Sequence, residues 1–206
     1  MPPSLFRSVA RLPAGKLVFE LFLVFVTVLA ALFANAAWQD RRDRAAGRGA
    51  LLAFAAEMRT NKDEIDARLD HHRVIVANTK AFLRELDGGA APPPEIFALR
   101  DRLTAGKGLR TPLLSRAAWD TSLIAGACTQ IPLATMLRIG RVYEVQRRLE
   151  AVLDQLIASF ASPTFFDTQR ATATATAFMV TFSMIVELEL TQTAAYEHCL
   201  AELGSS

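Results

Sequence analysis

Hydrophobic side chains fill one continuous run near the start of the chain and recur at helical spacing over most of the remainder. The run over residues 17–37 reads LVFELFLVFVTVLAALFANAA, and most of its residues are Leu, Val or Phe. As a helix it would rise about 31 Å, which matches a bilayer hydrocarbon core of about 30 Å. The pattern therefore predicts one transmembrane helix over residues 17–38.

The predicted span carries residues typical of a membrane interface at both ends. Glu20 follows Lys16 by one helical turn, so the two side chains can pair near the membrane surface. Trp38 at the other end is typical of an interfacial anchor. The residues expected to form the membrane anchor are Leu17, Glu20, Phe25, Leu29, Phe33 and Trp38.

A cleaved signal peptide is the competing interpretation of this span. Ala34-Asn35-Ala36 has the small-x-small form that signal peptidase accepts. The apolar run exceeds the usual signal core of roughly 7 to 15 residues, and no Pro or Gly breaks it. Arg41, Arg42 and Arg44 would also crowd the new N-terminus. We therefore favour an uncut signal-anchor.

Basic residues flank both ends of the span and give no decisive orientation. Those before it are Arg7, Arg11 and Lys16, and those after it are Arg41, Arg42, Arg44 and Arg48. The commoner topology keeps a short N-terminal tail in the cytoplasm and exports the domain that follows the span. The expected location is the bacterial inner membrane, single-pass, with the domain on the periplasmic side.

The pattern over the rest of the chain predicts three long helices and two short ones. Apolar residues recur at three- and four-residue steps over 50–86, and Asp87-Gly88-Gly89 ends that helix. Pro132 opens a second long helix that runs to residue 160, and Ser162-Pro163 opens a third that runs towards residue 203. Short helices are expected over 94–104 and, with Ser115 as the N-cap, from there through Trp119 to Ala125, where Gly126 ends the helix.

The predicted fold is all-α: an N-terminal transmembrane helix followed by an elongated antiparallel bundle of three long and one or two short helices. Its parts are a basic tail over 1–16, the span over 17–38, a basic linker over 39–49 and a bundle domain over 50–204. Gly47 and Gly49 make the linker the expected flexible point. A charge-free run over 173–186 is too short and too rich in Thr for a second span.

Composition excludes some classes of partner. The chain has 206 residues, with 23 Lys and Arg against 21 Asp and Glu. The basic residues are spread along the chain, so nucleic acid is not an expected partner. Cys128 and Cys199 form no CxxC pair and no zinc motif. A disulfide would be possible in an exported domain, but we favour two free, buried thiols.

The densest group of ionisable residues predicts no catalytic or metal site. It comprises Asp63, Glu64, Asp66, Asp70, His71 and His72. On a helix Asp66 and Asp70 share a face, but His71 and His72 point about 100° apart. No pair of Glu-x-x-His motifs supports a di-metal site. We expect a solvated charged face beside one partly buried His, with no metal and no cofactor.

Other signatures of catalysis are also missing from the sequence. His198 and Cys199 are adjacent, so their side chains diverge on a helix and cannot form a nucleophile and base pair. His198 can instead pair with Glu202 one turn on. The sequence has no GxSxG, GxGxxG or GxxxxGK[ST] motif. The expectation is that the chain is not an enzyme.

Several features together resemble a family of small bacterial single-span membrane proteins classed as a domain of unknown function. The features are AAWQDRRDR after the span, an acidic residue four before an Asn, the segment AAWDTSLIAGA and a Tyr on the next helix. The resemblance covers most of residues 17–160 and implies no reaction. It implies a polar and aromatic contact set that joins the long helices, made of Glu57, Asn61, Trp119, Asp120 and Tyr143.

The sequence favours a membrane-anchored helical module that acts by contact with another membrane or envelope protein or with itself. The lipid bilayer is its other expected partner. The alternative is an envelope sensor or small-ligand-binding bundle without an output domain of its own, with a pocket near Asn61, His72 and Tyr143. An enzyme would need a cleft with perturbed acids around Asp66 and Asp70.

Overall fold

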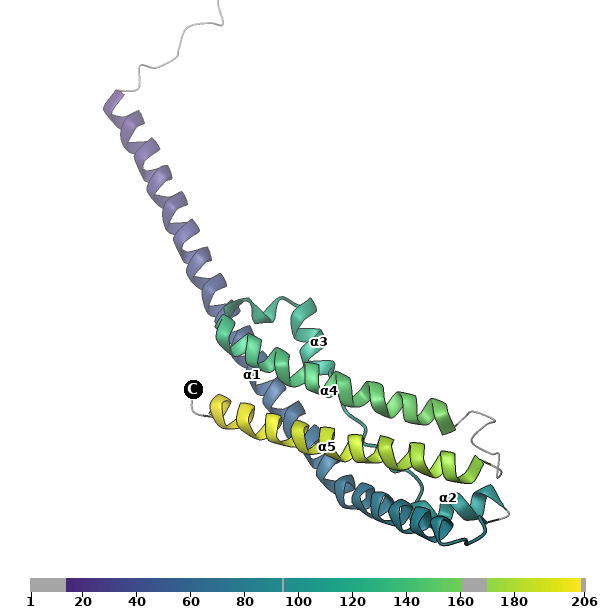
Figure 1. Ribbon diagram of the computed structural model, residues 1–206. Helices are drawn as coiled ribbons and strands as arrows, with labels where there is room; N and C mark the ends of the chain where they lie inside the picture. Colours follow the sequence, from purple (N-terminus) through teal and green to yellow (C-terminus); the bar gives the residue numbers. More distant parts are fainter. Residues whose placement is uncertain (1–13, 94, 161–169, 205–206) are drawn as a thin grey trace, which may run out of the picture. The chain divides into compact units, whose positions relative to one another are not determined.

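The structure is a computed structural model that describes residues 14–93, 95–160 and 170–204 (Figure 1). The chain divides into two compact units, residues 1–46 and 47–206. The helices are α1 (Ala14–Asp87), α2 (Ile96–Thr104), α3 (Ala117–Ile124), a 3-10 turn η1 (Ala127–Gln130), α4 (Leu133–Phe160) and α5 (Ala171–Gly204). The described residues contain no strand, so the all-α class expected from the sequence is confirmed.

The described part of the first unit is the beginning of α1, residues 14–46, most of which is apolar. Its large hydrophobic side chains are exposed from Leu17 through Phe33 to Trp38. A helix of a water-soluble domain buries an apolar stripe, whereas this segment is apolar and uncovered on all sides. By length and composition alone, two described helices could cross a membrane, α1 through this segment and α5.

Residues 39–49, which the sequence predicts to be a basic linker, are helical and belong to α1. Each helix-interior glycine costs about 1 kcal/mol relative to alanine, and the Ala and Arg residues around them are good helix formers. A Cβ placed on Gly47 would lie 3.4 Å from Gln130 Cβ, so Gly47 packs closely against η1. Two glycines are therefore too weak a signal to end this helix.

The core of the second unit is built from the inner faces of α1, α4 and α5. From α1 it takes the fully buried Phe54, Met58, Ile65, Ile75 and Phe82, which follow the helical spacing of the sequence. Ile139 and Leu149 of α4 and Phe182, Ile185 and Tyr196 of α5 complete its centre. α4 and α5 lie side by side along much of their length (Figure 1).

Most helix ends follow the sequence signals. Gly89 has φ of +89°, and the Ala90 N–H donates to the Glu85 carbonyl at 3.0 Å, which closes α1 at Asp87. α4 begins directly after Pro132 and ends at residue 160, as expected. α2 and α3 begin within two residues of their expected starts. The Ser162-Pro163 start predicted for the last helix lies outside the described residues.

Candidate functional site

The carboxylate of Glu57 on α1 accepts three hydrogen bonds from other parts of the second unit. The Tyr143 hydroxyl donates to Oε1 at 2.6 Å. The Ser115 hydroxyl and the Ala118 N–H each donate to Oε2 at 2.8 Å. The first N–H groups of a helix have no partner within that helix, and their positive dipole end favours an anion. Glu57 therefore caps α3 from a different helix.

Asn61, one turn further along α1, holds the backbone of Ser115 at both of its polar groups. Its Nδ2 donates to the Ser115 carbonyl and its Oδ1 accepts from the Ser115 N–H, each at 2.8 Å. Gln146 Nε2 on α4 donates to the same carbonyl at 3.1 Å. The Tyr196 hydroxyl on α5 donates to Gln146 Oε1 at 2.8 Å. We call Glu57, Asn61, Ser115, Tyr143, Gln146 and Tyr196 the Glu57 network.

Aromatic rings cover the Glu57 network on one side. The Trp119 ring stacks on Tyr143 with 5.0 Å between ring centroids and 29° between planes. Phe54 contacts both rings, at centroid distances of 5.7 Å to Trp119 and 6.4 Å to Tyr143. A Cβ on Gly140 would lie 3.6 Å from Trp119, so the indole lies close to the α4 backbone. These contacts exclude water from the Tyr143 hydrogen bond.

The two tyrosines of the Glu57 network have raised pKa values. Burial raises the pKa of Tyr143, and its hydrogen bond to the Glu57 carboxylate raises it further. Burial is also the main cause that raises the pKa of Tyr196. Both hydroxyls therefore remain hydrogen-bond donors and are poor candidates for a catalytic base.

The structure brings four of the five residues of the expected contact set together: Glu57, Asn61, Trp119 and Tyr143. Asp120 differs, because its side chain is exposed on α3 and pairs with Arg116 at 3.3 Å. The sequence missed Gln146 and Tyr196. Gln146 had a detectable signal, since it follows Tyr143 at helical spacing on the apolar face of α4, where a polar residue needs a partner.

A second buried polar contact joins α1 to α5. His72 Nδ1 lies 2.9 Å and 3.0 Å from the two carboxylate oxygens of Glu189, and its Nε2 lies 2.9 Å from the Leu109 carbonyl. Both side chains are fully buried. Because oxygen atoms face both ring nitrogens, the pair must hold a proton between Nδ1 and the carboxylate. His71 Nε2 is 2.8 Å from the neighbouring Gly108 carbonyl.

This arrangement corrects the expectation of one partly buried His beside a solvated face. His71 and His72 are both buried, and His72 has a carboxylate partner 117 positions away. The charged face itself is present: Asp66 pairs with Lys62 at 2.6 Å, and the exposed Asp70 pairs with Arg73 at 3.1 Å. No group of three metal-ligating side chains occurs among the described residues.

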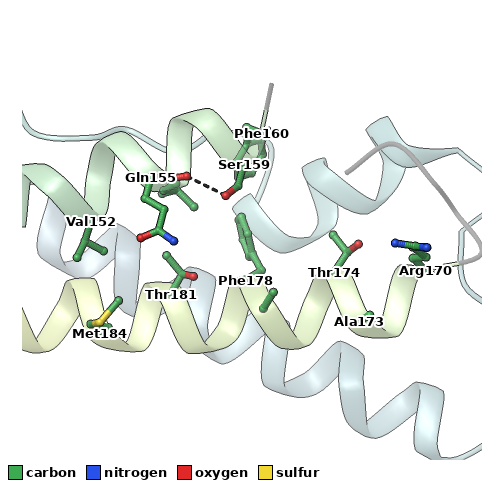
Figure 2. Close-up of a pocket in the computed structure, with 12 residues that line it drawn as sticks. Val152, Gln155, Ser159, Phe160, Arg170, Ala173, Thr174, Phe178, Thr181 and Met184 are labelled. Atoms are coloured by element: carbon green, nitrogen blue, oxygen red, sulfur yellow. Dashed lines mark hydrogen bonds between the residues drawn. The ribbon is translucent and has the colours of Figure 1, made fainter. Parts of the chain in front are cut away.

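A cavity of about 380 Å³ lies between α4 and α5 (Figure 2). Its apolar wall includes Val152, Leu156 and Phe178. Its polar groups belong to Gln155, Ser159, Arg170, Thr174 and Thr181. The Ser159 hydroxyl donates to the Gln155 carbonyl at 2.8 Å. Cavities of this size hold small ligands in many proteins.

The cavity is not where the sequence placed a ligand pocket. Asn61, His72 and Tyr143 are buried in the packed interior, whereas the cavity is lined by the second half of α4 and the first half of α5. The lining suits a small amphipathic molecule. The aliphatic and phenyl side chains of the cavity would contact the apolar part of such a molecule, and the hydroxyl and amide side chains would contact its polar part.

The remaining residues singled out from the sequence have simple surroundings. The Arg42 guanidinium lies 5.7 Å from the centroid of the Trp38 ring. His198 pairs with Glu202 at 3.5 Å, as expected. Cys128 and Cys199 are free thiols, and burial raises the pKa of both. Neither thiol is therefore poised as a nucleophile at neutral pH.

Comparison of the chain with protein-family models, with curated proteins and with solved structures gives no match.

Proposed function

We propose that this chain is a single-pass protein of the bacterial inner membrane whose helical domain acts by contact with other proteins. The observation that carries the proposal is the exposure of the apolar side chains over residues 17–38. Leaving so much apolar surface in water costs about 25 cal/mol for each Å², and a bilayer removes that cost. We place the domain on the periplasmic side of an uncut signal-anchor.

The domain is proposed to be an elongated antiparallel bundle of its three long helices. The contact between α4 and α5 and the buried links from α1 to both of them support this arrangement. The motifs around Trp38, Glu57 and Trp119 also lead us to propose kinship with the bacterial single-span family of unknown function.

Protein contact explains the polar groups of the domain better than catalysis does. The side chains of the Glu57 network point at one another and at backbone groups, and they are used up in holding α1, α3, α4 and α5 together. A satisfied buried network fixes a unique arrangement of helices. A rigid domain on a membrane anchor suits recognition of a partner held in the same membrane.

Photocrosslinking in native membranes tests this proposal. A photoreactive phenylalanine analogue at Val180, which is exposed on α5, should yield a discrete adduct with a second protein or a second copy of the chain. The same analogue at the exposed, charged position Asp70 controls for random collision. Protein that gives no adduct above the Asp70 control, and that neither oligomerises nor co-purifies with a partner after general crosslinking, would contradict the proposal.

The cavity between α4 and α5 favours a second candidate function, a sensor or carrier of a small amphipathic ligand. A thermal-shift screen of the full chain in detergent should then find a stabilising compound. Thr181→Phe, which fills the cavity, should abolish that shift, while Thr176→Phe on an exposed face of α5 should preserve it. A screen without any stabilising compound would reject this candidate.

A further inference from the structure

A stretch of the second unit combines exposure with an absence of charge. Residues 121–137 read TSLIAGACTQIPLATML and contain no charged side chain. The stretch covers the end of α3, the η1 turn and the start of α4. Ile124 is 89% exposed and Leu133 is 74% exposed, and Leu123 and Leu137 are also exposed. We call residues 121–137 the apolar segment.

The apolar segment packs on the first turn of the second unit. A Cβ on Gly47 would lie 3.4 Å from Gln130 Cβ, 3.6 Å from the Ala127 carbonyl oxygen and 3.7 Å from the Ile131 side chain. Ile131 is buried by this contact, while Ile124 and Leu133 remain outside it. Figure 1 shows η1 beside the part of α1 that begins the second unit.

Residues 39–46 tether the second unit to the predicted membrane anchor. The residues between Trp38 and Gly47 span about 14 Å as a helix, at 1.5 Å per residue. That length is about twice the headgroup region on one side of a bilayer, which is roughly 5 to 8 Å thick, so the tether is short enough for the second unit to reach the lipid surface. The tether also carries Arg41, Arg42 and Arg44, and Arg48 follows it; these side chains attract lipid phosphates.

We propose that the apolar segment inserts Ile124 and Leu133 into the lipid headgroup region and so holds the domain against the membrane. The inference rests on the proposed anchor, because the anchor supplies the tether. A lipid surface fits better than a protein partner, since protein interfaces surround an apolar centre with a polar rim and this segment has no charged group over its whole length. Exposed aliphatic side chains of this kind mark a binding surface.

Depth measurement by electron paramagnetic resonance tests this inference on the full chain. The background carries Cys128→Ser and Cys199→Ala, and circular dichroism checks that it keeps the wild-type helicity and melting temperature. Nitroxide labels are placed singly at Ile124→Cys and Leu133→Cys in vesicles of phosphatidylethanolamine and phosphatidylglycerol. The ratio of collisions with oxygen to collisions with a water-soluble nickel chelate reports depth in the bilayer.

Two further label sites make the outcomes distinguishable. Leu113→Cys is the matched control, because Leu113 is 80% exposed but its N–H contacts Glu64, about 26 Å beyond Gly47 along α1. Phe25→Cys reports on the anchor itself. We expect the collision ratio at Ile124 and Leu133 to be several-fold higher than at Leu113, and the ratio at Phe25 to be higher still.

Each alternative result has a definite meaning. Labels at Ile124 and Leu133 that match Leu113, while Phe25 lies deep, overturn the lipid contact and leave the anchor intact. A Phe25 label in water overturns the anchor and the inference with it. Labels at Ile124 and Leu133 that are shielded from both oxygen and nickel indicate a protein contact and also overturn the inference.

Discussion

The hydroxyl of Tyr143 on α4 donates a 2.6 Å hydrogen bond to Oε1 of Glu57 on α1, 86 positions earlier in the chain. The other oxygen of the same carboxylate accepts from the Ala118 N–H at the start of α3. The Glu57 side chain thus connects α1 to α4 and caps the short helix α3. Hydrogen bonds to a charged group are stronger than neutral ones, so this contact should contribute measurably to stability.

Removal of the Glu57 carboxylate should destabilise the domain. Glu57→Ala leaves the Tyr143 hydroxyl, the Ser115 hydroxyl and the Ala118 N–H without their acceptor, and we expect a loss of about 2 to 3 kcal/mol. Thermal unfolding of the full chain in detergent, followed by circular dichroism, measures it. Asp120→Ala is the control, because its exposed pair with Arg116 should contribute less than about 1 kcal/mol. Equal effects of the two substitutions would contradict the role given to Glu57.

The tyrosines of the Glu57 network predict a loss of stability at alkaline pH. Burial raises the pKa of Tyr143 and of Tyr196 above the unfolded value of about 10, so the folded chain keeps two protons that the unfolded chain releases. Their stabilising contribution is complete below about pH 10. It then falls by about 1.4 kcal/mol per pH unit for each tyrosine.

Denaturant unfolding of the wild type and of Tyr196→Phe between about pH 9 and 12 checks this sign. The substitution should remove one tyrosine's share of the alkaline slope, whatever it does to the stability at neutral pH. Identical slopes for the two proteins would show that Tyr196 titrates as it does in the unfolded chain.

The His72 and Glu189 pair should behave as one coupled unit. His72→Leu or Glu189→Leu alone leaves an uncompensated polar group in the core and should cost about 3 to 5 kcal/mol. The double substitution removes both groups and should cost clearly less than the sum of the two. A double-mutant cycle from thermal unfolding measures the coupling. Strictly additive effects would mean that the two side chains do not interact in solution.

The continuity of α1 through its two glycines predicts opposite effects at neighbouring positions. Gly49 has open space around its Cα, so Gly49→Ala should stabilise the helix by about 0.5 to 1 kcal/mol. Gly47→Leu should destabilise the domain, because its side chain would meet Gln130 and Ile131. The melting temperatures of the two variants, compared with that of the wild type, measure both effects. A destabilising Gly49→Ala would indicate a break in the helix at that position.

The sequence predicted those parts of the fold that depend on local signals. Pro132 and the apolar spacing that follows it placed α4, and Asp87-Gly88-Gly89 placed the end of α1. The sequence did not show that Gly47 lies inside a helix and packs on Gln130, because that contact involves a segment distant in the chain. For the same reason the sequence could not identify Glu189 as the partner of His72, or Tyr196 as the partner of Gln146.

The candidate site, too, was predicted only in part. Glu57, Asn61, Trp119 and Tyr143 were expected together from the resemblance to the single-span family, because no local signal in the sequence shows which distant segments meet. Asp120 was expected beside them, but its direction on a short helix depends on where α3 begins. Only tertiary structure fixes that point, through the Glu57 cap on Ala118.

The intact mass of the 206-residue chain recovered from carbonate-washed membranes tests the central claim most directly. An uncut anchor over residues 17–38 predicts a species of 22.5 kDa that stays in the membrane pellet. A shorter species that begins at Ala37 and appears in the soluble fraction would contradict it, because the chain would then have been cleaved after Ala34-Asn35-Ala36.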